Sequence, residues 1–224
     1  MFVGHYGPAF VAKRLEPSIP LWLLFIAVQF LDVLWAPLVL LGIERVRIVP
    51  HFTGSNALDL YYMPFTHGLL TALAWALLVA VLYRAIIHPA RWQAGVVLGA
   101  AVFSHWALDL VVHVADLPLY ANTAKVGFGL WNAPLIAFAV EALILGGGLS
   151  YYLRGGARRP VGTVVFGTTL LLIQAFTTFV SPPPRSDRAF AYTALTAYVL
   201  FALVIWWIAD RRPRDVRGST ATTP

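Results

Sequence analysis

The chain of 224 residues contains no cysteine, which excludes a disulfide framework, a thiolate metal site and a cysteine nucleophile. Charged residues are also scarce. They make up 12% of the sequence, against about 25% in soluble domains, while 59% of the residues are hydrophobic. This composition excludes a disordered chain and an ordinary soluble enzyme, and it predicts an integral membrane protein. We expect a single membrane domain over residues 1–210 and a polar basic tail over residues 211–224.

Apolar runs long enough to cross a bilayer recur along the sequence. A spanning helix needs about 20 predominantly apolar residues. The candidate spans are residues 20–42, 65–87, 92–114, 132–153, 161–180 and 190–209. The predicted fold class is therefore all-α, a polytopic transmembrane helix bundle with about six spans. Five spans remain possible, because the fifth segment is short and rich in threonine. The Gly146-Gly147-Gly148 run in the fourth segment favours close helix packing.

The net charge of +6 comes from basic residues that lie between the apolar segments. With six spans both termini lie on one side, and that side carries eleven of the 16 Lys and Arg residues. The positive-inside rule then predicts an integral membrane protein with both termini in the cytoplasm. The expected partner is the lipid bilayer, and this charge distribution does not call for a nucleic acid. Loops 43–64 and 115–131 fall on the outer side.

The third segment carries a stripe of histidine and aspartate side chains. At about 100° per residue, the four members fall within an arc of about 80° on one helix face. They are His105, Asp109, His113 and Asp116. Histidine and aspartate four residues apart converge on one point, which is a common arrangement of metal ligands. A polar seam between packed helices is the alternative interpretation.

Three more ionisable side chains lie within or at the mouth of predicted spans. Asp32 is in the first segment, His67 opens the second, and Glu141 is buried in the fourth. A charged group in hydrocarbon is costly and has to face a partner inside the bundle. Because no Lys or Arg occurs at a matching depth in any predicted span, we expect a metal ion or a histidine as the partner of Asp32.

His5 can reach the depth of Asp32 in the membrane only if the N-terminal segment enters the bundle. We predict a short re-entrant helix over residues 5–14 that turns at Glu16-Pro17 and runs antiparallel to the first span. At 1.5 Å per residue, His5 then lies roughly 15 Å above the turn and Asp32 roughly 18 Å above it. Such a segment has to be buried in protein. A helix lying flat at the membrane interface is the alternative.

Together these residues supply imidazole and carboxylate groups, both of which can bind a metal ion. The candidate metal ligands are His5, Asp32, His67, His105 and Asp109, with His113 and Asp116 as possible additional ligands. This set suits a divalent metal, most readily Zn²⁺, with Mn²⁺ or Fe²⁺ as alternatives. A metal of this kind activates water for hydrolysis, and Asp32 or Glu141 is the candidate catalytic base. Glu44 and Asp59 in the outer loop are expected to be solvated, and the alternative is that they hydrogen-bond to the metal ligands and orient them.

The motifs Gly4-His5, Asp32, Thr66-His67-Gly68 and Ser104-His105-Trp106-Ala107-Leu108-Asp109 resemble the YdjM-like family of inner-membrane metal-dependent hydrolases. The resemblance covers residues 1–116 and implies a distant similarity to zinc-dependent phospholipase C and P1 nuclease. It also implies that the protein lies in the plasma (inner) membrane, that the five candidate ligands bind metal and that the substrate is a phosphoester or is carried on a lipid. The chain departs from the family pattern at two places: the second carboxylate near Asp32 is absent, and Gly68 stands where serine is common.

Other functions are compatible with the same residues. A transporter or channel could use the histidine and aspartate stripe as an ion or proton pathway. A b-type haem protein could use His67 and His105 as axial ligands. A structural membrane scaffold would need these side chains only for stability.

Overall fold

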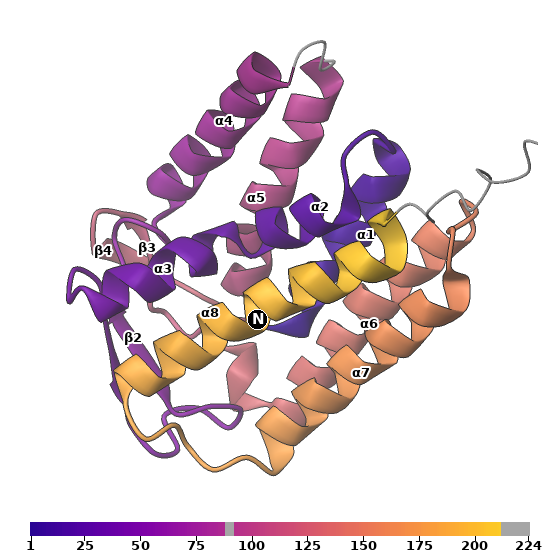
Figure 1. Ribbon diagram of the computed structural model, residues 1–224. Helices are drawn as coiled ribbons and strands as arrows, with labels where there is room; N and C mark the ends of the chain where they lie inside the picture. The colour runs from indigo at the N-terminus through magenta and orange to yellow at the C-terminus, as the bar shows by residue number, and fades with distance from the viewer. Residues whose placement is uncertain (88–91, 212–224) are drawn as a thin grey trace, which may run out of the picture.

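The computed structural model describes residues 1–87 and 92–211 (Figure 1). The connection between the second and third predicted spans, residues 88–91, and the predicted tail beyond Arg211 lie outside these residues. The helices are α1 (Tyr6–Leu15), α2 (Leu21–Val28), α3 (Phe30–Leu40), α4 (Leu69–Ile86), α5 (Trp92–Val112), α6 (Pro134–Leu153), α7 (Pro160–Phe179) and α8 (Asp187–Ile205). Short helical turns lie at Val3–His5 (η1), Leu130–Asn132 (η2) and Trp206–Asp210 (η3).

The long apolar helices agree with the predicted spans. Helices α4 to α7, and α8 together with η3, are each long and apolar enough to cross a membrane. Helices α2 and α3 meet the same criterion only as a pair, and the pair is bent by 56°. The described chain therefore holds five such helices, or six if the bent pair is one span.

Two small antiparallel hairpins correct the prediction of a purely α-helical fold. Strand β1 (Arg45–Ile48) pairs with β2 (Leu58–Tyr62), and β3 (Leu117–Tyr120) pairs with β4 (Thr123–Val126). Both hairpins lie in segments predicted as outer loops. The side chain of Lys125 donates to the carbonyl oxygen of Tyr61 at 2.6 Å and so ties the hairpins together. Strands of four or five residues are too short to produce a signal in a search for apolar spans.

The bend between α2 and α3 lies at Gln29, which has φ −106° and ψ 9°. Its buried side chain donates from Nε2 to the carbonyl oxygen of Phe2 at 3.2 Å. The last carbonyls of a helix lack donors from the helix itself. The bend therefore leaves the carbonyl of Val28 available to a side chain from another helix.

The N-terminal segment forms η1 and α1 and enters the bundle, as the depth argument predicted. Figure 1 shows the chain start in the middle of the molecule, beside α8. Tyr6 and Phe10 are fully buried and pack on Phe25 of α2. At the far end of α1, Lys13 donates to the carbonyl oxygen of Ile19 at 2.7 Å and closes the turn into α2. Partial burial lowers the pKa of the Lys13 ammonium group.

Helix α1 packs closely on α6 because both helices carry a glycine at the crossing. A Cβ atom added to Gly148 would collide with the backbone of Gly7, and one added to Gly7 would collide with the carbonyl of Ile144. Gly146 and Gly147 have no atom within 4 Å of such a Cβ among the residues described. Of the predicted glycine run, only Gly148 therefore serves the close packing that holds the N-terminal segment in place.

Candidate metal centre

Asp109 lies at the centre of a cluster of histidines and is 2% exposed. His105, one turn earlier on α5, places its Nε2 3.1 Å from Asp109 Oδ2. His113, one turn later, places its Nε2 3.6 Å from the same oxygen. The spacing of four residues thus brings both rings to the carboxylate, as predicted from the helix geometry.

Two other segments bring His67 and Asp32 to the same point. His67 lies two residues before the start of α4, and its Nε2 lies 3.3 Å from Asp32 Oδ1 and 3.7 Å from Asp109 Oδ2. Asp32 lies on α3, and its Oδ1 is 3.8 Å from His105 Nε2. The sequence predicted a metal ion or a histidine as the partner of Asp32. The structure places two histidines beside it, His67 and His105.

His5 completes the cluster from η1. Its side chain is fully buried, and its Nε2 lies 3.2 Å from Asp109 Oδ1. The ring stacks on His105 with 3.9 Å between the centroids. The α-amino group of Met1 donates to the same Asp109 oxygen at 2.5 Å. All five residues predicted as metal ligands are thus brought together by the fold.

Hydrogen bonds on the opposite side of each ring fix which nitrogen faces the cluster. His105 Nδ1 lies 2.7 Å from the carbonyl oxygen of Val28, and His113 Nδ1 lies 2.8 Å from Asp116 Oδ1. Because a carbonyl or a carboxylate can only accept, each Nδ1 carries the hydrogen. The Nε2 lone pairs are then free toward Asp109, and an outer hydrogen bond of this kind is typical of histidines that bind metal.

Glu44 orients His67 through the hydroxyl of Thr66. Thr66 Oγ1 donates to Glu44 Oε2 at 2.6 Å, so it has to accept from His67 Nδ1 at 2.8 Å. Glu44 also accepts from the backbone N–H groups of Phe65 and Thr66. The expectation that Glu44 is solvated was wrong, because it is 1% exposed. Asp59, its neighbour in that expectation, pairs instead with Arg47 on the adjacent strand.

The cluster has the residue types of a metal site, and several of its buried nitrogen atoms have no hydrogen-bond partner among the described residues. The ligand atoms of His5, His105 and Asp109 lie within 4.8 Å of one another, as do those of Asp32, His67 and His105. Both ring nitrogens of His5 and the Nε2 of His105 are buried and have no hydrogen-bond partner in residues 1–87 or 92–211. Buried polar atoms are rarely left unpaired, so this arrangement fits a divalent cation held by nitrogen and oxygen donors.

The two triads form one continuous site because they share His105, whose single free nitrogen belongs to both. The same crowding argues against a haem. Asp32 and Asp109 each approach the Nε2 atoms of both His67 and His105, whose ring centroids are 5.4 Å apart. A macrocycle would have to displace both carboxylates.

Glu141, predicted as a possible base, holds the N-terminal segment. Its Oε2 accepts from the backbone N–H groups of Phe2 at 2.9 Å and Gly4 at 3.1 Å. Its Oε1 accepts from Gln174 Nε2 of α7 at 3.2 Å. These donors connect α6 and α7 to the segment that carries His5.

Tyr198 of α8 belongs to the site although no sequence motif points to it. Its hydroxyl donates to Asp32 Oδ2 at 2.6 Å and is the contact that α8 makes with the cluster. In the sequence, Tyr198 is only a tyrosine within an apolar helix. The exposed Tyr192 on the same helix has the same character, so the sequence does not distinguish the two.

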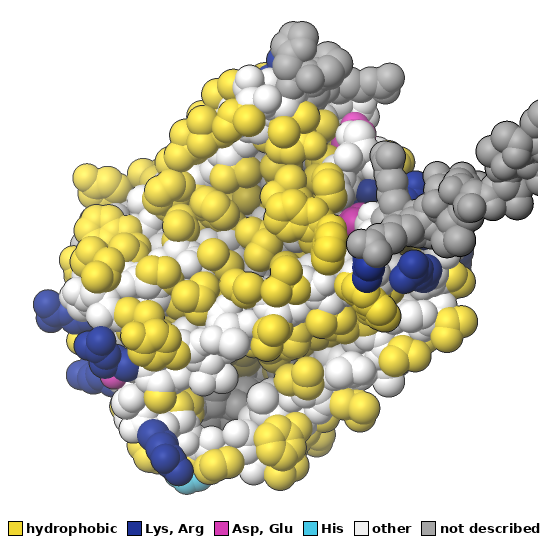
Figure 2. All heavy atoms as spheres, viewed as in Figure 1, with side chains coloured by type: hydrophobic (Ala, Val, Ile, Leu, Met, Phe, Trp, Pro, Cys, Tyr) yellow, Lys and Arg dark blue, Asp and Glu magenta, His cyan; other side chains and the backbone are white. Residues whose placement is uncertain are grey.

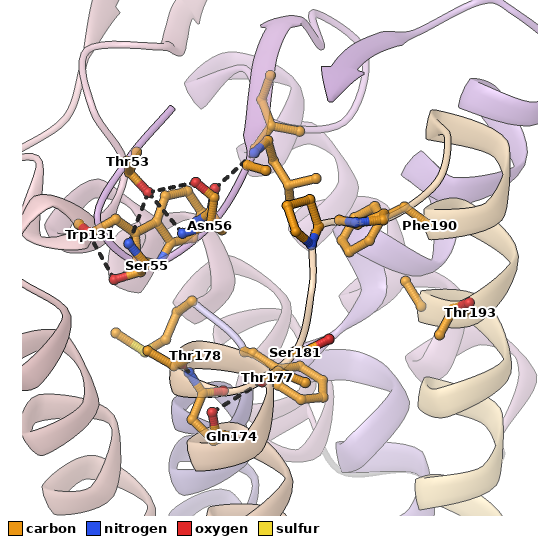
Figure 3. Close-up of a pocket in the computed structure, with 18 of the residues that line it drawn as sticks. Thr53, Ser55, Asn56, Trp131, Gln174, Thr177, Thr178, Ser181, Phe190 and Thr193 are labelled. Carbon is orange, nitrogen blue, oxygen red and sulfur yellow. Dashed lines mark hydrogen bonds between the residues drawn. The ribbon is translucent and has the colours of Figure 1, made fainter. Parts of the chain in front are cut away.

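A cavity of about 770 Å³ leads from the cluster to the surface. Asp32, Asp109 and His67 lie at its inner end. Figure 3 shows Thr177 and Thr178 of α7 on one side and Phe190 and Thr193 of α8 on the other. The loop between β1 and β2 closes a third side, where Ser55 donates to the carbonyl oxygen of Trp131 at 2.8 Å. The candidate metal site is therefore accessible to a ligand.

Comparison of the chain with protein-family models, with curated proteins and with solved structures found no match in any of the three. The function proposed below consequently depends on the geometry of the site.

Proposed function

We propose that this protein is a membrane-embedded metal-dependent hydrolase that acts on a phosphoester. The observation that carries the proposal is the convergence of the Nε2 atoms of His67 and His105 on two carboxylates, the buried Asp109 and the partly buried Asp32. We further propose an integral plasma-membrane protein with about six spans, in which α2 and α3 form one bent span and α1 is re-entrant. Both termini then face the cytoplasm.

The ligand set favours zinc, with manganese or iron as alternatives. His67, His105 and Asp109 would hold the ion, and His5 reaches the other oxygen of the same carboxylate. When bound, such a metal lowers the pKa of a coordinated water and polarises a phosphoryl oxygen. Since His105 and His67 are held through Nδ1 by Val28 and Thr66, the protein keeps the ligand geometry fixed before substrate arrives.

Asp32 is the better candidate for the base. Its side chain is 17% exposed toward the cavity, whereas that of Asp109 is 2% exposed. Tyr198 fixes one of its oxygens, and the other faces the metal site. Glu141 is occupied by three donors, so in this proposal it anchors the N-terminal segment.

The test is elemental analysis of the full chain purified in a non-ionic detergent. We expect bound divalent metal in the parent protein, and loss of most of it in His105→Ala. His51→Asn is the matched control, because His51 lies in the loop between β1 and β2 and outside the cluster. The control should keep the full metal content.

A phosphodiesterase assay with a chromogenic substrate should then show activity that requires the metal. Folded parent protein without metal would contradict the proposal. Bound metal that crosses the membrane of liposomes, with transport abolished in Asp109→Asn and with no hydrolysis, would instead support the transporter alternative.

A further inference from the structure

The cavity that leads to the metal centre separates two helices that follow one another in the chain. Helix α7 packs on α6, whereas α8 packs on α2 and α3. The cavity is lined by Ile173 and Thr177 from α7 and by Ala197 and Phe201 from α8. Both walls are thus formed by helices that are apolar and long enough to cross a membrane.

The outer surfaces of the same two helices are apolar. Leu172 and Phe176 of α7 are 66% and 55% exposed, and Val199 and Leu200 of α8 are 44% and 52% exposed. Figure 2 shows hydrophobic side chains over this face and a recess between the two helices near its lower edge. A cavity that opens through such a face communicates with the hydrocarbon of a bilayer.

The polar groups of the cavity suit an anion. The guanidinium group of Arg185 lies at the rim, in the segment between α7 and α8. Trp35, 3% exposed, also lines the cavity, and its indole N–H has no acceptor among the residues that the structure describes. The carboxylates of the lining are those of the inner end, Asp32, Asp109 and Glu141. Arginine and an unpaired N–H donor are groups that recognise phosphate oxygens.

We infer, building on the proposed function, that the substrate is a phosphate-bearing amphiphile that reaches the metal centre sideways between α7 and α8. Its phosphate lies near Trp35, between Arg185 at the rim and the metal centre, and its chain lies against Ile173, Ala197 and Phe201. A soluble phosphoester would not need an apolar wall that continues to the lipid-facing surface.

The absence of cysteine allows a direct test by single-cysteine labelling. Ala197→Cys places a thiol in the cavity wall, and Val199→Cys places one on the outer face of α8 as the matched control. Both variants are labelled with N-ethylmaleimide in dodecyl maltoside, which supplies an alkyl chain without phosphate. The probes are dodecylphosphonate, which cannot be hydrolysed, methylphosphonate, which lacks the chain, and dodecyltrimethylammonium, which has the opposite charge.

We expect dodecylphosphonate at about ten times its Kd to slow labelling of Ala197→Cys about tenfold, because the bound fraction is protected. Labelling of Val199→Cys should not change. Methylphosphonate and dodecyltrimethylammonium should protect neither variant. Adding Arg185→Gln should raise the dodecylphosphonate concentration for half-protection about threefold to fivefold, as expected for an exposed ion pair. Arg185→Lys should restore part of the protection.

The metal content of each sample separates this inference from the proposed function. If Ala197→Cys contains metal and dodecylphosphonate does not protect it, the amphiphile inference is wrong while the hydrolase proposal stands. Equal protection by methylphosphonate would also overturn it, in favour of a soluble phosphoester. If the sample contains no metal, the proposed function fails, and protection that depends on chain and charge would still support an amphiphile site.

Discussion

His5 and His105 stack face to face, with their ring planes 7° apart, although one ring comes from η1 and the other from α5. Both rings direct Nε2 toward Asp109, at 3.2 and 3.1 Å. Two stacked imidazolium ions would repel each other, so the arrangement disfavours charging both rings at once, and metal binding would require both to be neutral. The stack therefore couples the position of the N-terminal segment to the candidate metal centre.

Removal of the Thr66 hydroxyl should weaken metal binding without removing a ligand. Thr66→Val keeps the shape of the side chain but breaks the connection from Glu44 to His67 Nδ1. We expect metal affinity to fall about 10-fold to 100-fold, as is usual when the outer partner of a metal-binding histidine is lost. The affinity is measured by competition with a chelator. Thr169→Val on the exposed side of α7 is the control, and equal affinities for the two variants would show that Thr66 does not orient the ligand.

Enlarging Gly148 should destabilise the protein, whereas the same change one residue earlier should not. A Cβ atom at position 148 already meets the backbone of Gly7 on α1, whereas a Cβ atom at position 147 has no described atom within 4 Å. Overpacking of this kind costs about 1–3 kcal/mol, so we expect a lower midpoint of thermal unfolding for Gly148→Val alone. Because α1 is continuous with η1, this variant should also bind metal more weakly. A lowered midpoint in both variants would mean that the glycine run is needed for another reason.

Substitution of the two candidate bases should separate anchoring from catalysis. Glu141→Gln keeps an oxygen that can accept from Phe2 or Gly4, so we expect nearly full metal content and measurable hydrolysis. Asp32→Asn removes the charge beside His67 and should abolish hydrolysis and reduce bound metal. Metal content and hydrolysis are measured on the same preparations. A Glu141→Gln protein that binds metal fully but is inactive would assign the role of base to Glu141.

Hydropathy and helical spacing were sufficient to predict the parts of this fold that depend on local sequence. The apolar segments became helices α2 to α8, and the spacing of His105 and Asp109 predicted that they share a face of α5. The depth of His5 followed from the rise per residue only under the hypothesis of a re-entrant N-terminal helix, and a helix lying flat at the interface was the alternative. Local sequence could not predict the burial of Glu44, because that depends on the backbone of Phe65 folding over it. The bend at Gln29 could not be predicted either, because neither a proline nor a glycine occurs at this position.

Tyr198 is the clearest case of a site residue determined by tertiary structure, and its hydroxyl gives a test of its role. Its O–H donates to Asp32 Oδ2 at 2.6 Å across the interface of α8 with α3. Tyr198→Phe leaves that carboxylate oxygen without its donor, so we expect a loss of about 1–2 kcal/mol in the free energy of unfolding. The metal content should stay full, because the hydroxyl contacts Asp32 Oδ2 whereas the histidines lie near Oδ1, while hydrolysis should fall because Asp32 is no longer held in one orientation. Tyr192→Phe, on the exposed side of α8, is the control. Loss of metal in Tyr198→Phe would mean that this hydroxyl supports the ligand set itself rather than the orientation of the base.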